Sequence, residues 1–127
     1  MASADRLVLV VDDEPDIRSL VCTMLQAAGF QTVAASDGDE VFALALAHRP
    51  AAVVLDLMMG RLDGYTALTR LRAHTATHEI PVVILTALGD VRYQALSAGV
   101  GALAHLTKPF TRRQLVDTVH RVVGADR

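Results

Sequence analysis

The chain has 127 residues, 52% of them hydrophobic, and a formal net charge of −2. A chain of this length forms one domain and buries about two thirds of the surface that its unfolded form exposes, so it needs no disulfide or metal to hold a core. The small net charge argues against a strong field for capturing nucleic acid or an anionic membrane. Cys22 is the only cysteine and Leu7–Val11 is too short for a signal peptide or membrane span, so we expect a cytoplasmic protein.

Apolar runs of strand length alternate with helical patterns along the whole chain, which predicts βαβ units with a mainly parallel sheet in one domain, 1–127, whose core covers about residues 7–123. The predicted strands are Leu7–Val11, Phe30–Ala35, Ala51–Leu55, Pro81–Leu85 and Ala102–Thr107. The predicted helices start at Pro15, after the capping-box-like Ser36–Asp39, after Asp63-Gly64, near Asp90 and after the Thr111/Gln114 capping box. They end near residue 28, at about Arg49, beyond Leu71, near Ala98 and beyond Val123.

Reactive polar side chains follow four of the five predicted strands. Asp12 and Asp13 follow the first strand, Asp56 the third, Thr86 the fourth and Lys108 the fifth. The carboxyl ends of parallel strands lie on one edge of the sheet, and ligands bind in the crevice outside that edge. The sequence therefore predicts that three acids, a hydroxyl and an amine converge there.

Three carboxylates brought this close need a cation. Two unit charges 4 Å apart repel by about 4 kcal/mol at an effective dielectric near 20. Hard oxygen ligands without Cys or His favour Mg²⁺, which shares itself readily with phosphate oxygens. A carboxylate beside Mg²⁺, an amine and a hydroxyl is well placed to attack phosphorus, and Asp56, alone on the central strand, is the natural choice. Taken singly, Asp13 or Glu14 has about even odds of only capping the next helix.

These residues stand in blocks that resemble the receiver (REC) domain of two-component response regulators. The blocks are Val-Val-Asp12-Asp13-Glu14-Pro15, Leu55-Asp56-Leu57-Met58-Met59, Leu62-Asp63-Gly64, Leu85-Thr86-Ala87 and Leu106-Thr107-Lys108-Pro109-Phe110. The resemblance covers about Leu7 to Val123. It implies a single flavodoxin-like α/β fold, with a doubly wound five-stranded parallel sheet in order 2-1-3-4-5 and five helices.

The resemblance also implies a cofactor and a set of metal ligands. By it, Asp56 is the phosphoacceptor, and Mg²⁺ is bound by Asp13, Asp56 and the main-chain carbonyl of Met58, while Asp12 acts mostly through water. Thr86 is the hydroxyl that follows the phosphoryl group. Lys108 pairs with the phosphoryl group.

The partners implied are a histidine kinase or phosphotransfer protein as phosphodonor and a downstream protein that reads the face of the fourth helix, fifth strand and fifth helix. From the small net charge we expect no direct nucleic-acid binding and no membrane partner, and we expect a monomer or a phosphorylation-dependent homodimer. The domain is then a stoichiometric phosphoacceptor rather than an enzyme.

Three departures from the family pattern concern the output more than the chemistry. Gly60 stands where proline is common, which favours a more flexible loop after the phosphoacceptor strand. His105 stands at the switch position that is usually Tyr or Phe, and Leu103 and Ala104 replace a commonly acidic pair. We expect His105 to be a size substitute, with a muted or pH-sensitive switch as the alternative, and the apolar pair to favour hydrophobic partner contacts.

Met58 and Leu88 flank the expected path of the hydrolytic water, and because both are apolar the sequence predicts a slowly decaying phosphoryl group.

Three other functions compete with the receiver interpretation. A Mg²⁺-dependent phosphohydrolase would carry Asp-x-Asp after its first strand, whereas Asp12 and Asp13 are adjacent. A dinucleotide-binding module would carry a glycine-rich phosphate loop there. A phosphorylation-independent receiver-like interaction domain stays open because of His105.

Overall fold

The computed structural model describes residues 6–57, 64–87, 99 and 101–125. Five strands form one sheet in this part of the chain. They are β1 (Leu7–Val11), β2 (Gln31–Ala35), β3 (Ala52–Asp56), β4 (Val82–Ala87) and β5 (Ala104–Lys108). The sheet has the order β2-β1-β3-β4-β5, and all four pairings are parallel. The predicted fold class and strand order are confirmed.

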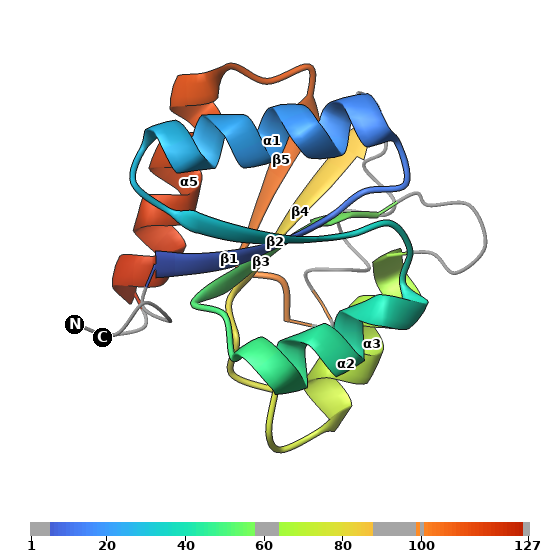
Figure 1. The fold of residues 1–127 in the computed structure, drawn as a ribbon. Coiled ribbons are helices and arrows are strands. Elements are labelled where there is room, and N and C mark those ends of the chain that lie inside the picture. Colours follow the sequence, from blue (N-terminus) through green and yellow to red (C-terminus); the bar gives the residue numbers. More distant parts are fainter. Residues whose placement is uncertain (1–5, 58–63, 88–98, 100, 126–127) are drawn as a thin grey trace.

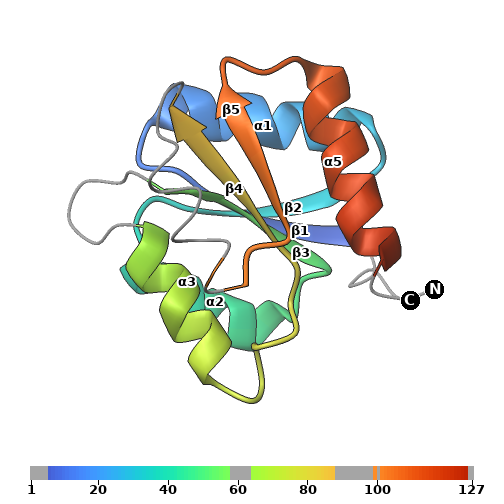
Figure 2. The same ribbon diagram turned by 180° about the vertical axis from the view of Figure 1, so that it is seen from behind.

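Helices cover both faces of the sheet (Figure 1). The helices α1 (Pro15–Ala27) and α5 (Arg112–Ala125) lie on one face, and α2 (Asp39–His48) and α3 (Gly64–Ala73) lie on the other. The reverse view in Figure 2 shows the same two layers around the sheet. The helix predicted over Asp90–Ala98 lies outside the described residues. None of the helices described is long and apolar enough to cross a membrane.

The core is divided by the sheet into two clusters. Val8 and Val10 of β1 pack in the cluster that contains residues of α1 and α5, whereas Leu9 and Val11 pack in the cluster that contains residues of α2 and α3. Successive side chains of a strand point to opposite faces, and a parallel strand covered on both faces is apolar throughout. This explains why β1 and β3 are continuous apolar runs rather than alternating ones.

Local signals set the helix boundaries. Pro15 is the first residue of α1, and Glu14 occupies the N-cap position that the sequence offered for it, although its side chain makes no cap hydrogen bond. The Thr111/Gln114 capping box is confirmed, since the Gln114 amide donates to Thr111 Oγ1 at 3.1 Å and the Thr111 amide donates to Gln114 Oε1 at 2.8 Å. Gly29 has a φ of 96°, the left-handed conformation that glycine allows after a helix.

The second helix is capped somewhat differently from the expectation. Gly38 is its N-cap residue, Asp37 Oδ1 accepts a hydrogen bond from the Asp39 amide at 2.9 Å, and Glu40 Oε1 accepts one from the Ser36 amide at 2.9 Å. The capping signal predicted within Ser36–Asp39 therefore also needs Glu40, one residue further along.

Four strands begin later than predicted: β2, β3 and β4 by one residue and β5 by two. The Phe30 amide donates to the Leu25 carbonyl, so Phe30 completes the turn that ends α1, and β2 begins at Gln31. Gly101 has a φ of 113°, and the sheet register of β5 begins where Ala104 pairs with Val83. β5 therefore begins after this turn, two residues later than the hydrophobic pattern indicates.

Candidate functional site

Three aspartates meet at the carboxyl edge of the sheet. Asp12 and Asp13 follow β1, Asp56 ends β3, and each offers a carboxylate oxygen such that the three atoms lie within 4.8 Å of one another. The side chains of Asp12 and Asp56 are buried, and Asp13 is exposed. The predicted convergence of the three acids is therefore present in the structure.

Lys108 provides the positive charge of the site. Its Nζ lies 3.3 Å from Asp56 Oδ2, 3.4 Å from Asp12 Oδ2 and 3.9 Å from Glu14 Oε1. Burial by itself would lower the pKa of Lys108, but the charges of Asp56 and Asp12 and their hydrogen bonds outweigh it, so that pKa is raised above its ordinary value. The ammonium group is therefore fully charged at neutral pH. Lys108 is also the only lysine in the sequence.

Thr86 lies at the same edge, between the acids and the lysine. It follows Leu85, the β4 residue that pairs with Asp56, and it pairs in turn with Thr107, the residue before Lys108. Its side chain is fully buried. The hydroxyl thus belongs to the strand that separates the central acid from the lysine, as predicted.

The backbone around Asp56 leaves room for only a glycine at the start of α3. The Gly64 amide donates to the Leu57 carbonyl at 2.8 Å, which fastens the start of this helix to the residue after Asp56. A Cβ built on Gly64 would lie 2.2 Å from the main-chain oxygen of Asp56 and 2.7 Å from the Cα of Leu57. Gly64 therefore permits the close approach of two backbones directly beside the acidic cluster.

The donor set fits Mg²⁺. Among the described residues, the three aspartates are the single group of three or more such side chains that could hold an ion, and no Cys or His belongs to it. Carboxylates within 4.8 Å of one another repel by about 3 kcal/mol a pair at an effective dielectric near 20. A hard divalent cation removes that repulsion. Met58, whose carbonyl is the other expected ligand, lies outside the described residues, as do Gly60 and Leu88.

Comparison with known proteins gives the family. The model of the response regulator receiver domain matches residues 8–120. The chain belongs to this family. Domains of this kind act as signalling switches in two-component systems.

Relatives and solved structures agree with the assignment. The chain is 38% identical over 116 residues to the DNA-binding dual master transcriptional regulator RpaA of Synechocystis, a match covering 91% of this chain and 48% of the relative. The chain spans about half the length of the curated relatives it matches. The structure of the chemotaxis protein CheY4 of Vibrio cholerae superposes with a TM-score of 0.86 at 32% identity, covering 91% of this chain and 97% of that one.

One solved neighbour bears on the cation. The receiver domain of a sensor histidine kinase from Pseudomonas aeruginosa, described with a magnesium ion coordinated in its active-site cleft, has a TM-score of 0.86 at 28% identity, over 94% of this chain and 98% of that one. Receiver domains bind Mg²⁺ at an acidic pocket, and this receiver domain has an acidic cluster at the corresponding edge of its sheet.

The three unusual output positions differ in their surroundings. Leu103 is 57% exposed, whereas Ala104 is buried in the core cluster of α1 and α5. The expectation that both side chains make the output face more apolar is therefore wrong for Ala104, because the alternation of β5 turns that side chain inward. His105 is partly buried and pairs with Ile84 of β4, and burial lowers its pKa below the usual value.

Sequence reasoning missed two polar residues that belong to the site. Glu14 lies 3.9 Å from Lys108 Nζ, and the Arg18 guanidinium donates a hydrogen bond to the main-chain oxygen of Asp12 at 2.9 Å. Glu14 directly follows the aspartate pair, so its proximity was detectable from the sequence. Arg18 lies four residues after Glu14, one helical turn, but no pattern indicates that its side chain turns back toward the loop.

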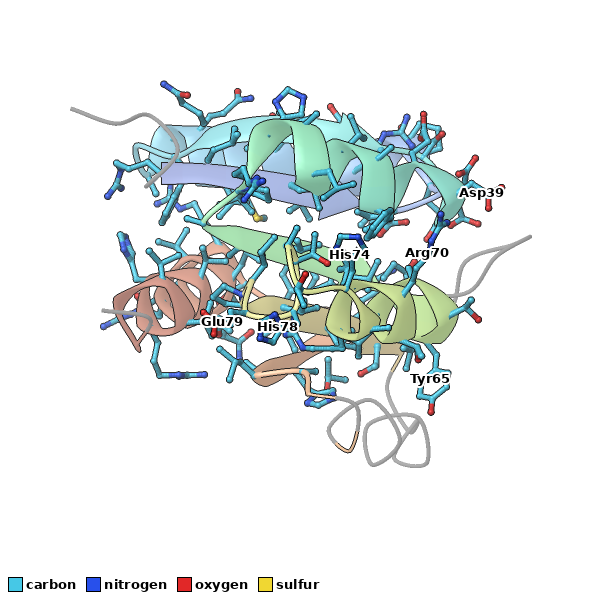
Figure 3. The ribbon with its side chains drawn as sticks, turned by 90° about the horizontal axis from the view of Figure 1, so that it is seen from below. Asp39, Tyr65, Arg70, His74, His78 and Glu79 are labelled. Carbon is cyan, nitrogen blue, oxygen red and sulfur yellow. The ribbon has the colours of Figure 1, made fainter. Side chains whose placement is uncertain are left out.

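The histidines His74 and His78 do not belong to the acidic group. Both are exposed, and Figure 3 shows His78 beside Glu79 and away from His74. His78 Nε2 lies 3.6 Å from Glu79 Oε2, whereas the His74 ring packs edge-on against Phe42 with centroids 5.0 Å apart. The two rings serve separate contacts.

Proposed function

We propose that the domain is a phosphorylation-activated switch in which Asp56 accepts a phosphoryl group from a histidine kinase or phosphotransfer protein. The observation that carries the proposal is the placement of Lys108 Nζ, 3.3 Å from Asp56 and 3.4 Å from Asp12 at the edge where the third acid also lies. An ammonium shared by two buried carboxylates is positioned to pair with phosphoryl oxygens once Asp56 has reacted.

The proposed reaction is a phosphoryl transfer. A carboxylate oxygen of Asp56 attacks the phosphorus of a phosphohistidine, an O–P bond forms, and the N–P bond breaks. The departing imidazole nitrogen keeps the electron pair and takes up a proton from solvent. Mg²⁺ held by Asp12, Asp13, Asp56 and the Met58 carbonyl would offset the charge that accumulates at the acids and the phosphoryl oxygens.

The remaining residues of the site would hold the product. Lys108 pairs with one phosphoryl oxygen, and the Thr86 hydroxyl donates to another. Thr86 and His105 lie on the same face of the sheet, because Thr86 pairs with Thr107 and His105 is two residues before that partner. A movement of the Thr86 hydroxyl toward Asp56 therefore frees space on the face where His105 lies.

The proposed output is a change in the surface formed by β5 and α5 and the segment between β4 and β5, read by a partner protein. Moving a two-state element from 1:99 to 99:1 needs about 5.5 kcal/mol of differential stabilisation, which two or three charge-assisted hydrogen bonds to the phosphoryl group can supply. Leu103, 57% exposed beside β5, favours an apolar contact with that partner.

Intact-mass measurement after incubation with acetyl phosphate and Mg²⁺ tests the acceptor. We expect the wild type to gain one phosphoryl group and Asp56→Asn to gain none. Asp117→Asn, which removes an exposed carboxylate of α5 that lies 3.8 Å from Arg113, is the matched control and should be phosphorylated like the wild type. No gain in the wild type, or an equal gain in Asp56→Asn, would refute Asp56 as the acceptor.

A further inference from the structure

The side chain of Arg18, in α1, returns to the acidic loop. Its amide donates to the Glu14 carbonyl at 2.9 Å, so the residue lies in the first hydrogen-bonded turn of the helix that Pro15 opens. From there Nη1 donates to the main-chain oxygen of Asp12, also at 2.9 Å. The bond joins the helix to the loop between it and β1.

This bond completes the set of contacts that fix Asp12. The amide of Asp12 donates to the Ala35 carbonyl at 3.2 Å, which continues the pairing of β1 with β2 by one residue. Its Oδ1 accepts from the Glu14 amide at 3.0 Å, and its Oδ2 faces Lys108 Nζ at 3.4 Å. With the carbonyl oxygen bound by Arg18, each polar atom of Asp12 has a described partner.

The orientation of a carbonyl sets the plane of the peptide that follows it. The Asp12 carbonyl belongs to the peptide that joins Asp12 to Asp13, so the bond from Arg18 fixes the plane from which the Asp13 side chain projects. Asp13 is the exposed member of the acidic cluster, with less packing around it than the two buried acids. The plane of this peptide is therefore one determinant of where the Asp13 carboxylate points.

We propose that Arg18 is a positioning residue for the cation site, which holds the Asp12–Asp13 peptide so that the carboxylate of Asp13 stays within the acidic cluster. The inference rests on the proposed function, in which that cluster binds Mg²⁺. Arg18 itself touches neither the cation nor the phosphoryl group. It acts through the main chain, as the residues behind metal ligands commonly do.

The sign of the effect separates positioning from simple charge. Removing a positive charge near three carboxylates would by electrostatics alone tighten Mg²⁺ binding. Loss of the hydrogen bond to Asp12 has the opposite effect, because the Asp12–Asp13 peptide must then be fixed at the expense of binding free energy when the cation binds. We expect Arg18→Met to bind Mg²⁺ about tenfold more weakly, at the lower end of the range for residues that orient metal ligands.

The test is a Mg²⁺ titration followed by ¹H–¹⁵N NMR, with the Glu14 amide as the reporter because it donates to Asp12 Oδ1. Arg18→Lys keeps the charge and a donor and should stay within threefold of the wild type. Arg18→Gln keeps a donor without the charge and also stands in for Arg18→Met if that variant does not fold. We expect Arg18→Gln to be weakened about threefold.

Arg113→Met is the matched control, since it removes the same group from α5, where the side chain is 90% exposed, and it should bind Mg²⁺ like the wild type. Thermal unfolding of each variant in EDTA shows whether the fold is kept. Unchanged or tighter Mg²⁺ binding by Arg18→Met, or an equal weakening in Arg113→Met, overturns the role of Arg18. If the wild type still binds Mg²⁺ saturably, the proposed function is unaffected by that result. A wild type without saturable binding overturns both.

Discussion

Lys108→Met removes the ammonium group of the site while it keeps most of the side-chain length. In the wild type Nζ lies 3.3 Å from Asp56 and 3.4 Å from Asp12, and both carboxylates are buried. The substitution therefore leaves two neighbouring buried carboxylates without the cation that they share. We expect the free energy of unfolding to fall in the absence of Mg²⁺.

The size of that fall follows from the geometry. Each of the two contacts is an attraction of about 5 kcal/mol at an effective dielectric near 20, before the cost of taking the ammonium out of water is subtracted. The Lys108 side chain is 23% exposed, so the desolvation cost and solvent screening remove part of this sum. Removing one partner of a buried pair costs about 3–5 kcal/mol, and we expect about 3 kcal/mol here. Mg²⁺ should restore most of the loss, because it binds the folded variant and supplies the missing charge.

The pH dependence has a definite sign. The pKa of Lys108 is raised by its acidic neighbours, so its contribution to stability is fully present below the unfolded pKa of about 10.4 and is lost as the pH rises through the folded pKa. The stability difference between wild type and Lys108→Met should therefore be constant from about pH 6 to 9 and narrow above about pH 10.4. Because Lys108 is the only lysine, selective ¹³C labelling of lysine gives one side-chain signal whose titration reports this pKa directly.

Urea unfolding in EDTA, followed by far-ultraviolet circular dichroism because the chain has no tryptophan, measures the difference. Lys108→Arg keeps the charge and should lose less than Lys108→Met. A loss below about 1 kcal/mol in Lys108→Met would place the pair among surface ion pairs and refute the assignment of a buried shared cation. A difference that already narrows at pH 8 would refute the raised pKa.

Three further substitutions test the surrounding structure by urea unfolding. Gly64→Ala should lower the free energy of unfolding by about 2–3 kcal/mol, because its Cβ would lie 2.2 Å from a main-chain oxygen of β3. The control Gly124→Ala, whose new Cβ has no atom within 4 Å, should not destabilise the protein. Equal losses of stability in the two variants would contradict the close approach of the two backbones. Arg72→Met removes two hydrogen bonds, of 3.2 and 2.9 Å, to the Gly101 carbonyl and should lower the free energy of unfolding by about 1 kcal/mol. An unchanged urea midpoint would show that these bonds do not contribute to stability. Burial lowers the pKa of His105, so protonation of this ring opposes folding and the stability of the wild type should fall as the pH drops below about 6.5. In His105→Phe the loss of stability between pH 7.5 and 5.5 should be smaller. An equal loss in both proteins would show that this ring does not contribute to the pH dependence of stability.

Most of the fold is predictable because its determinants are local or periodic. The β1 run Leu7–Val11 is apolar at every position, which indicates burial on both faces, and Pro15 and Gly29 mark where α1 begins and where the chain leaves it. The shared edge of the sheet then follows from the parallel topology alone, and with it the meeting of Asp12 and Asp56. No side-chain geometry is needed for that step.

The parts that cannot be predicted depend on rotamers and on approach distances. The bond from Arg18 to the Asp12 carbonyl requires one side-chain conformation among many, and the sequence contains only the spacing of the two residues. The steric need for Gly64 becomes visible only when the start of α3 is seen against the Asp56 main chain. The burial of Ala104 depends on the register of β5, which the sequence leaves open, and a shift of one residue exchanges the two faces of a strand.

The register of β4 and β5 also bears on how this domain could switch with a histidine at position 105. Thr86 and His105 lie on the same face, and His105 is two residues before the β5 partner of Thr86, so in the proposed switch a displaced hydroxyl and a moving imidazole would exchange space on that face. Burial lowers the pKa of His105 below its usual value, which favours the neutral form of the ring at pH 7. At neutral pH the ring therefore acts through its size rather than its charge, which supports the interpretation of His105 as a size substitute. A smaller ring with a polar edge would fill this space less well than tyrosine or phenylalanine, so in the proposed switch we expect His105 to change the free-energy gap between the two states rather than the route from Asp56 to the output face.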